Sequence, residues 1–139
     1  MIRRVIDASC IGALLIPDEA ENLMPGLISA LEEGACVVPA HWRYEVANLS
    51  LVAVRRKRVA SDEIAKSLAD LASYSIEIDA AGTVHAWSRT YRLAERHGLT
   101  IYDAAYLELA LRLSTTMFSL DEPLLQAARA EGVATESLS

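Results

Sequence analysis

Short apolar segments alternate with longer amphipathic ones along this chain, and this alternation limits the possible folds more than any other feature. Buried strands are predicted at residues 3–7, 35–38, 75–78 and 116–119. Parallel neighbours in a sheet need crossover connections, which helices usually supply. We therefore expect an α/β fold with a parallel sheet of four or five strands and helices on both faces.

The longer segments have helical spacing of apolar residues. Helices are predicted over residues 19–33, 42–58, 64–74, 80–97, 102–113 and 122–131. Pro25 removes a helical hydrogen bond and clashes with the preceding turn, so the first of these helices should be kinked or split near Met24. The second and third helices follow each other without a strand between them, which predicts a helical hairpin.

The composition indicates a protein that folds without help. Hydrophobic residues make up 53% of the 139 residues and charged residues 23%, so a continuous core is expected in one domain covering residues 1–139. Apolar runs fall short of the roughly 18–20 residues needed to span a membrane, so we expect a cytoplasmic protein without membrane contact. Cys10 and Cys36 form no C-x-x-C pair and are expected to be buried free thiols.

The net charge of −6 is opposite in sign to that of a protein that binds nucleic acid by general phosphate neutralisation. Any contact with nucleic acid must therefore be local. The basic candidates are Arg43, Arg55, Arg56, Lys57 and Arg58, followed by Arg89, Arg92 and Arg96 on later helix faces. The alternative for the run 55–58 is a solvated helix end, where cations suit the helix dipole.

Acidic side chains stand where a ligand would bind in such a fold. Asp7 closes the first strand and Asp121 follows the fourth, so both would face the crevice at the carboxyl ends of the strands. Glu45 lies in the first turns of one helix and Asp103 at the start of another. The alternatives are helix capping for the three aspartates and a solvated helix face for Glu45.

Taken together, these four acids predict a metal site. Two like charges about 4 Å apart cost about 4 kcal/mol at an effective dielectric constant near 20, and a bound cation would offset that repulsion. Mg²⁺ and Mn²⁺ take oxygen ligands and often combine a few carboxylates with substrate phosphate. Such a site would suit phosphodiester hydrolysis.

Four segments resemble those of PIN-domain ribonucleases, and most of all the VapC toxins of prokaryotic toxin–antitoxin pairs. They are Val5-Ile-Asp-Ala-Ser9; Pro39 and Ala40 with Tyr44-Glu-Val-Ala-Asn48; Leu99-Thr-Ile-Tyr-Asp-Ala-Ala-Tyr-Leu107; and Phe118-Ser-Leu-Asp-Glu-Pro-Leu124. Their order and spacing extend the resemblance over essentially the whole chain. It implies a PIN-like three-layer sandwich, Mg²⁺ or Mn²⁺, hydrolysis of RNA, a homodimer, and a cognate antitoxin that inserts a segment into the acidic groove.

The resemblance also assigns roles to residues. The acidic quartet of the family falls on Asp7, Glu45, Asp103 and Asp121 as catalytic and metal-binding residues. Ser9 and Ser119 match hydroxyl residues that would support the first aspartate by hydrogen bonding. His41 precedes Glu45 by four residues, which would suit either a shared metal or a cap at the helix start.

Two other readings remain open. An aspartate-based phosphotransferase or a phospho-accepting receiver domain would also place an aspartate after the first strand. However, the motif Asp7-Ala-Ser9 lacks a second aspartate, and neither paired acids before Asp7 nor a late lysine is present. The second reading is a catalytically idle binding module that dimerises through apolar helix faces.

Overall fold

The computed structural model describes residues 2–137 and contains one parallel sheet in the order β3-β2-β1-β4-β5. The strands are β1 (Arg4–Ile6), β2 (Cys36–Pro39), β3 (Ile76–Asp79), β4 (Thr116–Phe118) and β5 (Thr135–Glu136). The four predicted strands are present, and the sheet gains β5 at one edge. The predicted α/β class is therefore confirmed.

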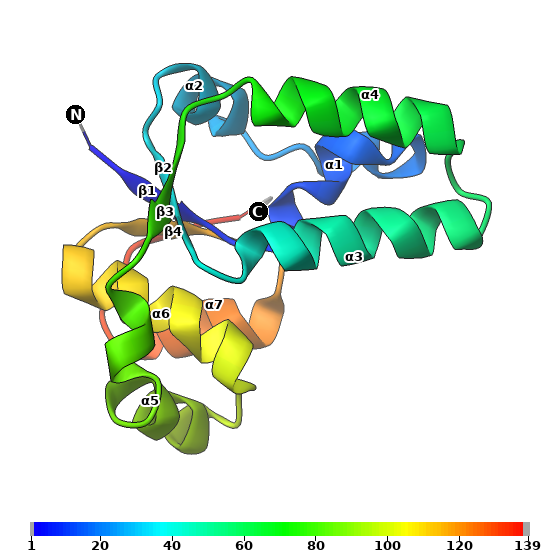
Figure 1. Ribbon diagram of the computed structural model, residues 1–139. Coiled ribbons are helices and arrows are strands. Elements are labelled where there is room, and N and C mark those ends of the chain that lie inside the picture. The colour runs from blue at the N-terminus through cyan, green and yellow to red at the C-terminus, as the bar shows by residue number, and fades with distance from the viewer. Residues whose placement is uncertain (1, 138–139) are drawn as a thin grey trace.

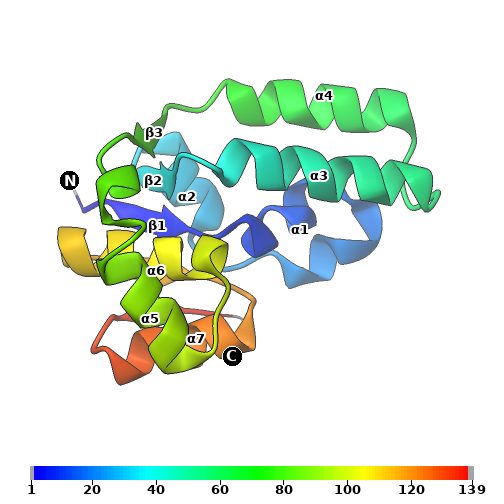
Figure 2. The same cartoon turned by 60° about the horizontal axis from the view of Figure 1, so that its bottom comes forward.

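Helices cover both faces of the sheet. They are α1 (Gly12–Leu15), α2 (Leu27–Glu32), α3 (Trp42–Arg55), α4 (Ser61–Ala72), α5 (Arg89–His97), α6 (Ile101–Leu113) and α7 (Glu122–Ala130). Figure 1 shows α1 to α4 on one side of the strands and α5 to α7 on the other, which gives three layers. The hairpin of α3 and α4 extends beyond the sheet, as the turned view in Figure 2 also shows.

The core lies between these layers. The β1 residues Val5 and Ile6 and the β2 residues Val37 and Val38 are fully buried, as expected for central parallel strands covered on both faces. Helix α6 packs against β1, β2 and β4. Its first turn begins at Thr100, whose hydroxyl oxygen accepts the N–H of Asp103 at 3.1 Å.

Some predicted helices have other limits. The predicted helix over residues 19–33 is split around Pro25 into a 3-10 segment (Pro17–Asn22) and α2. The predicted helix over residues 80–97 is wrong in its first half, which forms a short 3-10 segment (Gly82–His85) and a turn before α5. Val84 and Trp87 are exposed there, so this stretch has no buried stripe to stabilise a helix. Helix α3 ends at Arg55, and Lys57 takes a left-handed φ of 59°.

The register of the central strands places their ends side by side. Strands β1 and β4 are neighbours, with Ile6 opposite Phe118. The N–H of Asp7 donates to the carbonyl oxygen of Phe118 at 3.0 Å. The segments that follow β1 and β4 therefore start from the same edge of the sheet.

None of the helices within residues 2–137 is long and apolar enough to cross a membrane.

Candidate active site

Asp7 is held at the end of β1 by two serines. It is only 5% exposed, and its Oδ2 accepts hydrogen bonds from Ser9 Oγ at 2.8 Å and Ser119 Oγ at 2.7 Å. Each serine oxygen also accepts a backbone N–H, Ser9 from Leu120 and Ser119 from Asp121, both at 3.0 Å. These bonds fix the carboxylate and join the end of β1 to the loop before α7.

Burial makes the ionised form of the Asp7 side chain unfavourable relative to its protonated form. Burial raises the pKa of Asp7 from 3.8 to about 6, although the hydrogen bonds from Ser119 and Ser9 lower it. The negative charges of Asp103 and Glu45 raise this pKa further. Asp7 is therefore a buried carboxylate that lies within electrostatic range of Asp103 and Glu45.

Glu45 is fixed rather than solvated on a helix face. It is half-buried in the first turn of α3, and its Oε1 accepts the Tyr106 hydroxyl at 2.5 Å. The Nε2 atom of His41 lies 3.2 Å from the same oxygen. Burial alone would raise the pKa of Glu45, but the hydrogen bonds from His41 and Tyr106 outweigh it and lower the pKa.

Asp103 and Asp121 differ in whether they cap a helix. Thr100 caps α6, so the side chain of half-buried Asp103 is not needed there. Burial raises the pKa of Asp103, followed by the negative charges of Asp121 and Glu45. Asp121 does cap α7, because its Oδ1 accepts the N–H of Leu124 at 3.2 Å. The capping alternative therefore applies to Asp121 and not to Asp103.

The four acids come from four distant segments and lie in one region at the carboxyl edge of the sheet. Asp7 interacts electrostatically with Asp103 and Glu45, and Asp103 interacts with Asp121 and Glu45. As the side chains stand, however, no three His, Cys, Asp or Glu groups within residues 2–137 are close enough to ligate one ion. The acids form a loose cluster, which we call the acid cluster.

The predicted basic candidates lie away from this cluster or are engaged elsewhere. Arg55 follows Glu45 by ten residues on α3, which is about 15 Å along a helix axis. Arg56 and Lys57 are exposed just beyond it. Arg58 binds the carboxylates of Asp18 at 2.7 Å and Glu19 at 2.6 Å.

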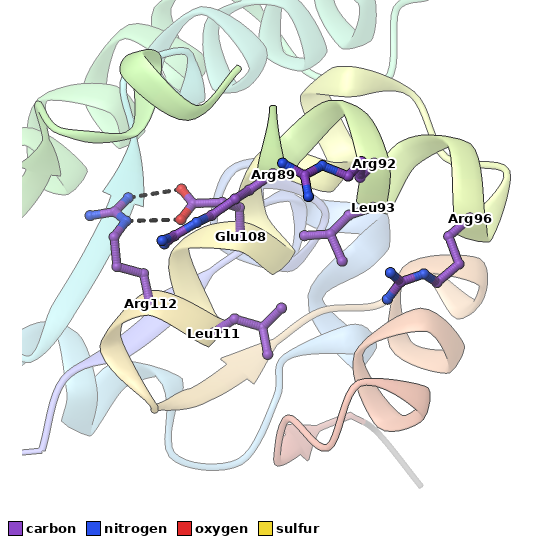
Figure 3. A pocket seen from close by; sticks show the side chains of 7 residues that line it. All are labelled: Arg89, Arg92, Leu93, Arg96, Glu108, Leu111 and Arg112. Carbon is purple, nitrogen blue, oxygen red and sulfur yellow. Dashed lines mark hydrogen bonds and ion pairs between the residues drawn. The ribbon is translucent and has the colours of Figure 1, made fainter. Parts of the chain in front are cut away.

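Arg43 is exposed on α3 and borders an apolar groove with Trp42. The arginines of α5 line a different pocket, together with residues of α6 (Figure 3).

Sequence reasoning missed two interactions made by residues of α6, of which only the first involves the acid cluster. Tyr106 lies one turn after Asp103 on α6, and that spacing is the signal that could have pointed to it. A second missed group is the guanidinium of Arg112, which bonds to Asp79 at 2.6 Å and Glu108 at 2.9 Å. Asp79 ends β3 in the way that Asp7 follows β1, so its position was the available signal.

Cys10 and Cys36 are buried and unpaired, as predicted.

Three comparisons with known proteins agree with one another. The model of the PIN domain family matches residues 4–130. Ribonuclease VapC3 of Pyrobaculum aerophilum is 30% identical over 125 residues, which cover 90% of this chain and 94% of that protein. The crystal structure of PAE2754 from Pyrobaculum aerophilum has the same fold, with a TM-score of 0.69 at 23% identity over 96% of this chain and 90% of that one. The chain therefore belongs to the PIN-domain family, and its predicted likeness to VapC-type members is confirmed.

Proposed function

We propose that this chain is a toxin-type endoribonuclease that hydrolyses RNA phosphodiesters at the acid cluster and depends on Mg²⁺ or Mn²⁺. The observation that carries the proposal is the mutual electrostatic influence of Asp7, Glu45, Asp103 and Asp121. The name of the relative Ribonuclease VapC3 supports the choice of RNA as substrate.

The residues present fit a hard divalent cation. The acid cluster offers only oxygen donors, and burial makes the charge of Asp7 costly without a counter-ion. Mg²⁺ retains several waters and binds through one or two carboxylates plus phosphate, so it does not need a closed protein cage. When bound, such an ion would neutralise the carboxylates and the phosphate, and would make a water more acidic.

The protein side chains around the acid cluster supply orientation. Ser9 and Ser119 hold Oδ2 of Asp7, so Oδ1 is the oxygen that would bind a ligand. Tyr106 and His41 fix Glu45 in its ionised form. Half-buried Asp103, whose own helix start is capped by Thr100, keeps its carboxylate available. Held groups of this kind reduce the reorganisation needed to bind a metal and substrate.

A cleavage assay tests the proposal. The chain is incubated with labelled single-stranded RNA and Mg²⁺ or Mn²⁺, and again with a chelator. Asp103→Asn is expected to reduce the cleavage rate by a factor of about 10² or more, because one charged oxygen donor is lost. Asp70→Asn, which changes an exposed acid on α4, should cleave at the unaltered rate. Cleavage that neither the chelator nor Asp103→Asn affects would reject the proposal, and no cleavage by the unaltered chain would favour an idle binding module.

Metal binding should also be visible without any substrate. An ion that binds only the folded chain stabilises it by RT ln(1 + [L]/Kd), which is about 2.7 kcal/mol at 100 times Kd. We therefore expect Mn²⁺ to raise the melting temperature of the unaltered chain and of Asp70→Asn, measured by calorimetry. The same titration should give a much smaller rise with Asp103→Asn. Equal rises in all three proteins would place the bound ion outside the acid cluster.

Two surface features could contact the two protein partners that the family implies, a second copy of the chain and an antitoxin. Val84 and Trp87, which are 77% and 97% exposed, lie with Tyr91 just before and within α5, and we infer that they contribute to a homodimer contact. The groove beside Trp42, between α3 and α4, is lined by Val46 and Leu68. Within residues 2–137 the buried Nε1 of Trp42 has no hydrogen-bond partner. We assign this groove, rather than the acidic groove that the resemblance implies, to an antitoxin segment that carries a hydrogen-bond acceptor.

A further inference from the structure

A groove between α5 and α6 gathers an unusual share of the positive charge of this acidic protein. It has a volume of about 270 Å³. Arg89, Arg92 and Arg96 project into it from one face of α5, and Arg112 and Glu108 border it from α6 (Figure 3). We call it the arginine groove. Positions separated by three and four residues share a helix face, which explains why the α5 arginines line up.

Two of these arginines have no acidic partner. Arg112 is occupied by Asp79 and Glu108, and Arg96 bonds to Glu131 at 2.7 Å. Arg89 and Arg92 are exposed, and within residues 2–137 neither forms an ion pair. Figure 3 shows the Arg89 side chain extending toward the pair of Glu108 and Arg112. The groove therefore presents at least two uncompensated guanidinium groups.

A second cavity of about 180 Å³ borders the arginine groove. His41 and Tyr102 are among its lining residues, and the Nε2 atom of His41 lies 3.2 Å from Oε1 of Glu45. Glu108 lines both the cavity and the arginine groove. The second cavity therefore meets the arginine groove at Glu108, and its residue His41 contacts Glu45.

We propose that the arginine groove binds backbone phosphates of the RNA substrate, an inference that rests on the proposed ribonuclease function. A chain with net charge −6 must hold a polyanion through a local cationic site, and guanidinium groups match phosphate oxygens in geometry. Arg89 and Arg92 are about 4.5 Å apart along the helix axis, so both guanidinium groups can contact one phosphate or two neighbouring ones. The exposed ring of Tyr102, in edge contact with His41, adds an aromatic surface to the second cavity, which favours a nucleic acid over an acidic peptide.

Binding measured without cleavage tests the proposal. The probe is a short, labelled single-stranded oligoribonucleotide, and its fluorescence anisotropy is followed in the presence of a chelator at several salt concentrations. The double variant Arg89→Gln/Arg92→Gln should bind at least about ten-fold more weakly. The slope of log K against log salt should fall by roughly 1.4, because each phosphate contact on a single strand contributes about 0.7. Arg55→Gln/Arg56→Gln removes the same charge from the exposed end of α3 and should bind like the unaltered chain.

Unchanged affinity and slope in the α5 variant, or equal losses in both variants, would overturn the proposal. A loss of binding to poly-L-glutamate with unchanged binding to RNA would also overturn it, and would assign the groove to an acidic peptide. Failure of the ribonuclease proposal is distinguishable from failure of this one. Groove-dependent binding by a chain that cleaves no RNA would leave the groove assigned, whereas cleavage with an unchanged KM in the α5 variant would reject it.

Discussion

Replacing Asp7 by asparagine is expected to abolish RNA cleavage and, in the metal-free protein at neutral pH, to stabilise the fold by about 1–3 kcal/mol. Activity is lost because the buried carboxylate is the best-oriented oxygen donor of the acid cluster. Stability is gained because burial raises the pKa of Asp7 from 3.8 to about 6, so its charge opposes folding above that pH. The asparagine oxygen can still accept the hydrogen bonds from Ser9 and Ser119.

The pH dependence of this gain has a definite sign. Below about pH 3.8 Asp7 is protonated in both states and contributes no difference. As the pH rises from 3.8 to about 6, Asp7 loses its proton in the unfolded chain before it does so in the folded chain. Ionisation of Asp7 therefore lowers the free energy of unfolding progressively over this range. Urea unfolding in a chelator should therefore show little advantage of Asp7→Asn near pH 4 and the full advantage near pH 7.

The control for this prediction is Asp70→Asn, an exposed change that should leave stability within about 0.5 kcal/mol at every pH. If Asp7→Asn destabilised the chain at neutral pH, Asp7 would have a structural role in joining β1 to the loop before α7.

Arg112→Met is expected to destabilise the protein by about 3–5 kcal/mol, the largest stability loss that we predict for a surface-reaching charge. The Arg112 guanidinium binds the side chains of Asp79 and Glu108, which are only 12% and 4% exposed. It also holds the pKa of Asp79 below its usual range. Removing the cation would leave two shielded carboxylates close together without a counter-charge. Equilibrium urea unfolding at neutral pH measures the loss.

Arg129→Met provides the matched control. Arg129 also binds a carboxylate, Glu122 at 3.4 Å, but both side chains of that pair are about half exposed. This change should cost less than about 1 kcal/mol. Adding Glu108→Gln to Arg112→Met should recover part of the loss, since one uncompensated charge disappears. Equal, small losses for both arginines would show that solvent screens the Arg112 network.

The sequence was most informative where a local pattern carries the structure. Strands β1 and β2 are continuous apolar runs, and their burial requires helices on both faces. The proximity of Asp7 and Asp121 follows from parallel strands ending at one edge, which needs no knowledge of side-chain packing. By contrast, β5 has only two residues and no apolar pattern, so nothing local distinguishes it from a loop.

Apolar patterns and strand order did not predict side-chain contacts between segments that are distant in sequence. The hydrogen bond from Tyr106 to Glu45 joins residues 61 apart in sequence, and the pair of Arg112 and Asp79 joins residues 33 apart. Such contacts depend on how α6 lies against α3 and β3, which periodicity does not encode. The separation of Arg55 from Glu45 did not need the tertiary structure, because the two residues are ten positions apart on one helix.

The paired serines also determine which protonation state the site accepts. Each hydroxyl accepts a peptide N–H and donates its own hydrogen to Oδ2 of Asp7. A proton arriving on that oxygen would meet two hydrogens already directed at it, so it would have to bind Oδ1 or turn one serine hydrogen away. The backbone after β4 thus imposes a one-sided polarity on this carboxyl group. In the proposed ribonuclease, exchange of ligands at Asp7 would therefore take place at Oδ1.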